Sequence, residues 1–259
     1  EPGAPAPDEN AVLFCGNAEG KREDRRGDVP ILVQCLAACA ARPSRHYVIV
    51  SGKSAGSIRK DLLRHFPPNV IRLYANNVEV RDARVCALPL GRDFRGREAF
   101  GVGCYTGERP HERPLCYGNF SLYTSPLRHR VYRRLRRRSW ITFEHMGAWL
   151  HYALSHEEYY RRVAGHRFII SPEGIGRDCY RTWDALYLKT VPIVIRSVTM
   201  SHFADLPILF TRSYRELTPR YLERQYRRML ETEYNMDKLR WSYWENRIRA
   251  DAAAIGASI

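Results

Sequence analysis

Short apolar stretches that alternate with helix-like segments constrain the fold of this chain more than any other feature. Residues 47–50 (YVIV), 70–73 (VIRL) and 191–195 (VPIVI) have the composition of buried strands. Between such stretches apolar residues recur at helical spacing, as over 54–66, where Pro67 ends the segment. Strands that alternate with helices predict βαβ units and therefore parallel sheets in an α/β fold.

The alternation breaks over residues 91–118, where six glycines and two prolines accumulate. Such a stretch is typical of a connection between domains. We therefore expect two α/β domains. In residue ranges, the N-terminal domain covers 1–105 with a flexible linker at 1–10, the interdomain linker covers 106–114, the C-terminal domain covers 115–235, and a C-terminal helix over 236–259 crosses back to the first domain.

Composition indicates a globular chain with a basic surface. Of the 259 residues 44% are apolar, which decides against a disordered chain, and the formal net charge is +14. A surface of that charge attracts nucleic acid, sulfated glycans, phosphate-bearing substrates or anionic lipids. No apolar run approaches the 18 residues that a membrane span needs. The N-terminal EPGAPAPDEN reads as a linker left after processing, so we expect the secretory-pathway lumen if an anchor was removed and the cytoplasm otherwise.

Metal chemistry is disfavoured by the pattern of cysteines and carboxylates. The chain has seven cysteines but no C-x-x-C pair, so a zinc site is not expected. No D-x-D pair occurs either. Proteins that hold a nucleoside diphosphate through a divalent cation need clustered oxygen ligands. We therefore expect no resident metal and no cofactor.

Residues 52–56 (GKSAG) match the G-x-S-x-G pattern between a strand and a helix. In a hydrolase this turn exposes a nucleophilic serine, which is Ser54 here. Only 51 residues precede the motif, too few for the strands that come before such a turn in hydrolases. The alternative is that Ser54 caps the following helix. A serine hydrolase that uses Ser54 remains one of the alternative functions.

An arginine-rich segment covers residues 128–138 (RHRVYRRLRRR) and holds seven arginines. Its apolar residues share one helical face, so most of the arginines should face solvent. Arg128 and Arg130 lie near the start of this helix, where an arginine can hold a phosphate with two hydrogen bonds. The same basic run also fits a second alternative, a protein without catalytic activity that binds nucleic acid or sulfated glycan.

The segment 171–184 (SPEGIGRDCYRTWD) follows the apolar stretch RFII and leads into a helix. Ligands of open α/β sheets bind beyond the carboxyl ends of strands, where this segment lies. Its glycines allow a close backbone approach, its arginines suit phosphates and its carboxylates suit hydroxyl groups, a combination that fits a nucleotide-sugar. The candidate ligand-binding residues are Ser171, Glu173, Gly174, Gly176, Arg177, Asp178, Arg181, Thr182 and Asp184. The alternative is a salt-bridged loop in which Asp178 caps the helix.

The run from 168 to 195 (FIISPEGIGRDCYRTWDALYLKTVPIVI) resembles the donor domain of the exostosin-type glycosyltransferases. Positions that match the family pattern in order and without a gap are Pro172, Gly174, Gly176, Asp178, Arg181, Trp183, Ala185, Leu186 and Pro192. The segments 118–121 (GNFS) and 88–91 (LPLG) are also similar to family motifs. The resemblance extends over roughly residues 70–245, and the first 45 residues match nothing.

This resemblance implies two Rossmann-like domains of the GT-B type, with a cleft between them and the sugar nucleotide bound in the C-terminal domain. Asp184 stands where the family has a glutamate for the ribose hydroxyls, and Lys189 replaces a helix-ending glycine. The implied activity is transfer of a sugar, first of all from a UDP-sugar, to a hydroxyl of a glycan or glycoprotein. Transfer would invert the anomeric centre without a metal, and nucleic acid is not an expected partner.

An inverting transfer needs a base that takes the proton of the acceptor hydroxyl. The family places the acceptor on the N-terminal domain, so we expect the base to come from that side. Asp93, just after LPLG, and His145, after the stretch WITF, are the two candidates.

Overall fold

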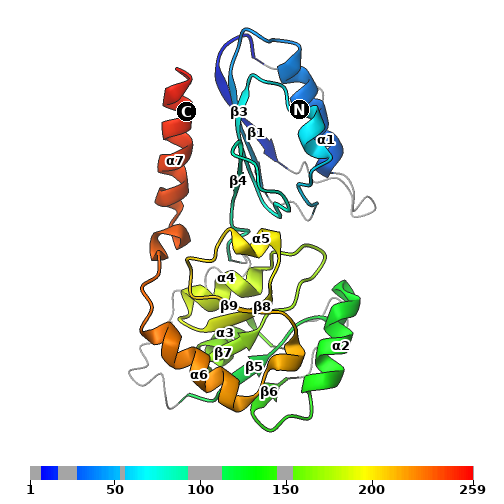
Figure 1. Ribbon diagram of the computed structural model, residues 1–259, viewed down its shortest axis with the longest axis vertical. Coiled ribbons are helices and arrows are strands. Elements are labelled where there is room, and N and C mark those ends of the chain that lie inside the picture. The colour runs from blue at the N-terminus through cyan, green and yellow to red at the C-terminus, as the bar shows by residue number, and fades with distance from the viewer. Residues whose placement is uncertain (1–6, 17–27, 53–55, 93–112, 145–153, 259) are drawn as a thin grey trace. The chain divides into compact units, whose positions relative to one another are not determined.

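The computed structural model of the protein describes residues 7–16, 28–52, 56–92, 113–144 and 154–258. Contacts divide the chain into two compact units, each with one parallel sheet (Figure 1). Unit 1 comprises Glu1–Leu90, Ser197–His202 and Asp237–Ile259, and unit 2 comprises Gly91–Arg196 and Phe203–Met236. The α/β class that the alternation predicts is thus confirmed. The linker expected at 106–114 lies mostly outside the described residues.

Unit 1 contains a four-stranded sheet in which the strands lie in chain order and all neighbours are parallel. The strands are β1 (Ala11–Gly16), β2 (Tyr47–Gly52), β3 (Val70–Ala75) and β4 (Val85–Ala87). Helix α1 (Asp28–Ala40) connects β1 to β2, and its side chains Leu32, Leu36 and Cys39 are buried. Neither β1 nor α1 was expected from the sequence.

The C-terminal helix α7 (Trp241–Ala254) packs against the sheet of unit 1. Ile248 of α7 meets Val48 and Tyr74 in one apolar cluster. Asp251 accepts a hydrogen bond of 2.6 Å from the Tyr74 hydroxyl and forms an ion pair of 3.1 Å with Arg72. The last helix of the chain therefore completes the core of the unit that the first strands begin.

The helix expected over 54–66 is a short 3₁₀ helix, η1 (Leu62–His65). Ile58 explains the difference, because it forms a parallel bridge with Val78. Its amide donates to the Asn77 carbonyl at 3.0 Å, and its carbonyl accepts from the Glu79 amide at 2.8 Å. This extended pairing is incompatible with a helix at the same residues, so helical geometry is confined to the part of the segment that follows.

Unit 2 contains a five-stranded parallel sheet in the order β6-β5-β7-β8-β9. Its strands are β5 (Cys116–Gly118), β6 (Ile141–Phe143), β7 (Phe168–Ile170), β8 (Val191–Ile195) and β9 (Leu209–Thr211). Its helices are α2 (Pro126–Leu135), α3 (His156–Ala164), α4 (Tyr180–Tyr187) and α6 (Pro219–Leu230), with 3₁₀ helices η4 (Leu122–Thr124) and η5 (Tyr214–Glu216). Short helices α5 (Val198–Ser201) and η6 (Met236–Leu239) lie near the unit boundaries. No helix of the described residues is both long and apolar enough to cross a bilayer.

Both faces of the unit 2 sheet are covered. Phe168 and Ile170 of β7 belong to the apolar cluster that includes side chains of α2 and α6. Ile169, between them, belongs to the cluster formed with α3 and α4. Successive side chains of a strand point to opposite faces, so the two helix pairs cover opposite faces of a doubly wound sheet.

The strand order of unit 2 reverses between β5 and β7. From β5 the chain moves to β6 on one side, and it then returns past β5 to β7 on the other side. This is the 2-1-3-4-5 order of doubly wound sheets, whose ligands bind outside the carboxyl ends of the strands at the reversal. The segments that leave β5 and β7 at this edge are therefore where a ligand is expected.

Candidate functional site

Two loops form the site at the reversal of strand order. The β5 loop (Asn119–Ser125) connects β5 to α2, and the β7 loop (Ser171–Cys179) connects β7 to α4. Ser125 ends the first loop as the N-cap of α2, where its hydroxyl accepts from the Leu127 amide at 3.3 Å and Pro126 takes the first helical position. α2 thus starts directly after the β5 loop.

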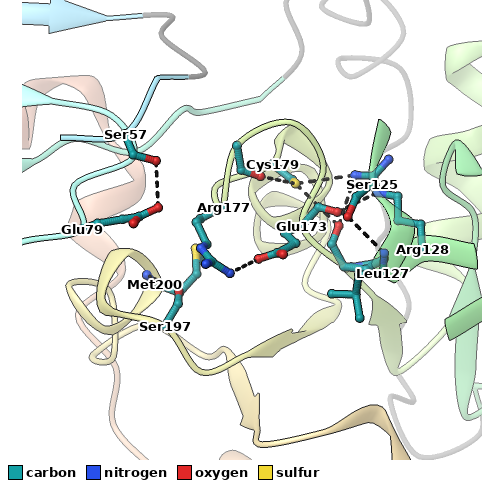
Figure 2. Close-up of polar contacts among 12 residues, drawn as sticks. Ser57, Glu79, Ser125, Leu127, Arg128, Glu173, Arg177, Cys179, Ser197 and Met200 are labelled. Carbon is teal, nitrogen blue, oxygen red and sulfur yellow. Dashed lines mark hydrogen bonds and ion pairs between the residues drawn. The ribbon is translucent and has the colours of Figure 1, made fainter. Parts of the chain in front are cut away.

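Arg128, in the first turn of α2, is buried and connects the two loops (Figure 2). Its Nε donates to the Glu173 carbonyl at 2.9 Å, its Nη2 to the Pro172 carbonyl at 3.1 Å, and its Nη1 to the Ser121 carbonyl at 3.1 Å. Nη2 also lies 3.7 Å from the Cys179 sulfur. All three guanidinium nitrogens are thus bonded to backbone carbonyls of the protein itself.

Gly174 is needed to make room for Arg128. A Cβ atom at Gly174 would lie 2.9 Å from Nη2 of Arg128 and 3.6 Å from the Thr124 hydroxyl oxygen. The Gly174 amide donates to the Gly176 carbonyl at 3.0 Å, which closes the turn. The sequence predicts that these glycines allow a ligand to approach; at Gly174 the close neighbour is a side chain of the protein.

Arg181, in the first turn of α4, contacts the β5 loop. Its Nε donates to the Asn119 carbonyl at 2.6 Å, and its guanidinium lies over the Phe120 ring at 5.6 Å. Its Nη1 atom is buried and has no hydrogen-bond partner in the described part of the chain. The N-cap of α4, Cys179, makes no side-chain hydrogen bond that caps the helix, and no acidic residue occupies the first turn. A buried donor without a partner is costly, so this group is suited to an anionic ligand.

Positive charge is concentrated around Phe120. The Arg128 guanidinium lies 5.9 Å from the centre of the same ring that Arg181 covers. Burial, followed by the positive charge of Arg181, lowers the pKa of Arg128 to about 10. Burial raises the pKa values of Cys179 and Tyr214 nearby, so both remain neutral at physiological pH. A phosphate would relieve the repulsion between the two guanidinium groups.

Three polar residues of the β7 segment are bonded to one another or to a neighbour. Asp178 is buried and accepts a hydrogen bond of 2.6 Å from the Trp183 indole. The N-cap of α4 is Cys179, so the alternative in which Asp178 caps the helix is wrong. The Ser171 and Thr182 hydroxyls, both buried, lie 2.9 Å apart and join the end of β7 to α4.

The other predicted residues differ in exposure. Arg177 forms an ion pair with Glu173 (Figure 2), whereas Arg130 is exposed on α2. Asp184 is buried on α4, and both its charge and that of Arg181 act on the Tyr159 hydroxyl, which places the three side chains in one region. Ser54, Asp93 and His145 lie outside the described residues.

Sequence reasoning missed two polar residues. The Thr124 hydroxyl is buried in the β5 loop and has no partner among the described residues. In unit 1, Glu79 follows β3; the Ser57 hydroxyl donates to it at 2.7 Å (Figure 2), and Arg59 pairs with it at 3.2 Å. The signal for Glu79 was its place just after a buried strand, where polar ligand-binding residues gather. In the described residues no three His, Cys, Asp or Glu side chains come together as a metal site, and metal independence stays a prediction.

The two parallel α/β sheets with a C-terminal helix define a fold of the GT-B type. Among solved structures, that of an alpha1,3-fucosyltransferase matches with a TM-score of 0.52 and 16% identity, over 94% of this chain and 77% of that chain. A structure of alpha1,3-fucosyltransferase with GDP-fucose has a TM-score of 0.49 and 15% identity, over 97% of this chain and 92% of that chain. No protein-family model and no curated protein matches. The likeness to the first structure is one of fold.

Proposed function

We propose that this protein is a glycosyltransferase that binds a nucleotide-sugar donor at the β5 and β7 loops and transfers the sugar to a hydroxyl of a glycan or glycoprotein. The observation that carries the proposal is the buried Nη1 of Arg181, which has no partner in the described part of the chain. It lies at the reversal of strand order, where such sheets bind their ligands. The GT-B type of fold and the exostosin-like run at 168–195 support it.

In this proposal Arg181, in the first turn of α4, holds the donor phosphates. Negative charge builds on the diphosphate as it leaves, so the interaction with Arg181 strengthens in the transition state. Asp184 and Glu173 offer acceptors to hydroxyl groups of the donor. The remaining residues proposed around the donor are Arg130, Ser171, Gly174, Gly176, Arg177, Asp178 and Thr182.

The nucleotide of the donor is part of the proposal. The resemblance to exostosin-type enzymes favours a UDP-sugar, and the likeness of fold to an alpha1,3-fucosyltransferase adds a fucosyl donor. We therefore put UDP-sugars first and GDP-fucose second. A panel of UDP-, GDP- and CMP-sugars in thermal unfolding decides between them, because a donor at 100 times its Kd stabilises the protein by about 2.7 kcal/mol.

The same panel tests metal independence. With EDTA present, the stabilisation by the true nucleotide should persist, because arginine rather than a cation would bind the phosphates. Loss of the shift in EDTA and its return with Mn²⁺ would refute the metal-free reading. If no nucleotide shifts the transition in either condition, the site assignment itself is wrong.

The base for the acceptor hydroxyl has three candidates in this proposal. Asp93 and His145 come from the sequence, and Glu79 adds a carboxylate whose orientation is fixed by Ser57 and Arg59. Inversion in a single displacement needs one such group. Glu79→Gln keeps the shape of the side chain and should lower turnover while donor affinity stays unchanged. If the variant has the same turnover as the wild-type protein, Glu79 is not the base, and Asp93 and His145 are the two candidates left.

A second candidate function, polyanion binding without catalysis, is favoured by the arginines of α2 and the turn after it. These exposed residues are Arg130, Arg133, Arg134, Arg136, Arg137 and Arg138, and none forms an ion pair with a described residue. Such a protein would bind heparin or DNA with a steep salt dependence and would bind no nucleotide-sugar. Nucleotide binding with sugar transfer excludes this candidate as the main function.

A further inference from the structure

Arg128 has contacts that do not fit a phosphate ligand. Its side chain is 6% exposed, and its hydrogen bonds run to carbonyls of both loops: Ser121 in the β5 loop, and Pro172 and Glu173 in the β7 loop. Lysine has three donors on a flexible stem, whereas the planar guanidinium directs its donors along fixed lines. Only arginine can serve these three acceptors together.

The β5 loop is held on both sides of Phe120. Arg128 bonds to the carbonyl after Phe120, and Arg181 bonds to the carbonyl before it. Both guanidinium groups lie over the Phe120 ring, which is buried. The position of Arg181 relative to the loop therefore depends on a segment that Arg128 attaches to the β7 loop.

The space at Gly174 is a separate observation that supports this role. Any side chain at Gly174 would meet Nη2 of Arg128 at 2.9 Å, a separation that Cβ atoms do not adopt. The close approach of the β7 loop to the guanidinium thus depends on the absence of a side chain at this one position. The φ angle of Gly174 is not positive, so the need for glycine here comes from space and not from backbone conformation.

We propose that Arg128 is a positioning residue, which joins the two loops and holds Arg181 and Phe120 in place for the donor without itself binding it. The inference rests on the proposed function for its role in catalysis. The joining of the loops does not depend on that function. It also differs from the sequence-based expectation that Arg128 holds a phosphate.

The first test compares Arg128→Lys with Arg134→Lys, a matched control on the exposed face of the same helix. A lysine keeps the charge, so a phosphate ligand would survive the change in large part. If Arg128 positions the loops, kcat/KM should fall about 100-fold, as expected for catalytic groups displaced by about 1 Å. Turnover and donor affinity should both fall, and the control should keep both.

The second test moves the guanidinium without removing it. Gly174→Ala should lower kcat/KM about as much as Arg128→Ala. The double variant Gly174→Ala/Arg128→Ala should have a kcat/KM no lower than either single variant, since all three lose the same connection between the β5 and β7 loops. Millimolar guanidinium chloride should restore activity to Arg128→Ala, whose cavity it fits, and methylammonium chloride should not.

Any one of three results would overturn the proposal. Arg128→Lys could keep the wild-type kcat and KM, the losses in kcat/KM of the two single variants could multiply in the double variant, or guanidinium could fail to restore activity to Arg128→Ala. If Arg128→Ala does not fold, Arg128→Lys and Gly174→Ala still decide. If the wild-type protein binds no nucleotide at all, the proposed function fails by itself. Coupling between Gly174→Ala and Arg128→Lys in the free energy of unfolding then tests the joining of the loops, and additive effects would refute it.

Discussion

Replacement of Arg181 by methionine should separate ligand binding from stability. In the unliganded protein the change removes the 2.6 Å bond from Nε to the Asn119 carbonyl. A hydrogen bond of a charged group contributes about 1.5–3 kcal/mol. The same change removes the buried Nη1 atom without a partner, which costs about 1–3 kcal/mol. It also ends the repulsion by Arg181 that, in addition to burial, lowers the pKa of Arg128. The gains and losses nearly cancel.

We therefore expect the free energy of unfolding of Arg181→Met to lie within about 1 kcal/mol of the wild-type value. Donor affinity should behave differently, since charged hydrogen bonds to phosphate are lost without compensation. A loss of about 1.5–3 kcal/mol corresponds to a 10- to 150-fold weaker Kd. Turnover should also fall, because the lost interaction is strongest on the leaving diphosphate.

Urea unfolding of the unliganded variant and calorimetric titration with UDP and GDP measure the two quantities. Arg134→Met, exposed on α2, is the control for the loss of one positive charge. The reasoning fails if Arg181→Met loses more than about 3 kcal/mol of stability while its nucleotide affinity stays the same. That pattern would make Arg181 a structural connection between the β5 loop and α4.

Three further changes probe the same unit. Asp184→Asn should weaken donor binding by about 1–3 kcal/mol and alter turnover much less, since the group is proposed to bind hydroxyls away from the reacting carbon; steady-state kinetics would show the reverse if it took part in the chemistry. Lys189 has a φ of 54°, in the left-handed region, which costs a non-glycine residue about 1–2 kcal/mol. Lys189→Gly should therefore raise the free energy of unfolding by about 0.5–1 kcal/mol, since the greater chain entropy of glycine in the unfolded state removes part of the gain. An unchanged midpoint of urea unfolding would contradict this. Burial lowers the pKa of His166, so the unfolded chain, with a pKa of about 6.5, binds a proton that the native state lacks, and stability should fall as pH drops from about 6.5 towards the lowered value. His166→Gln should flatten that dependence below about pH 6.5, and an unchanged pH profile would show that His166 has the same pKa in the native and unfolded states.

The β7 half of the site could be predicted from sequence because its signals are local. A buried strand, two glycines and a helix start occur within one short segment, and the structure has β7, the β7 loop and α4 in that order. The contact between the two halves of the site could not be predicted, since the hydrogen bond from Arg181 to Asn119 spans 62 positions. It depends on β5 lying next to β7, and apolar periodicity does not encode strand order.

Competition between partners explains why the alternative assignment of Asp178 as the N-cap of α4 is wrong. Asp178 is of a residue type that is common at N-caps and lies near the start of the helix. Its carboxylate instead accepts a hydrogen bond from the buried indole N–H of Trp183, five positions further on. A buried indole N–H must find an acceptor within the protein. The amides at a helix end that is open to a ligand can be satisfied by that ligand instead. The missed helix α1 has another cause: its sequence DVPILVQCLAACA is apolar on nearly all sides and shows no clear helical stripe.

Helix α7 belongs to unit 1 but is synthesised after unit 2, so the assembly of unit 1 during synthesis should be delayed. Roughly 150 residues separate Leu90 from Trp241, which takes about 8–30 s at 5–20 residues per second. During that interval Val48 and Tyr74 lack the partner that covers them in the finished protein, while unit 2 is already complete as far as Met236. The nascent chain should therefore be most prone to aggregation, and most dependent on chaperones, while its first unit waits for its last helix.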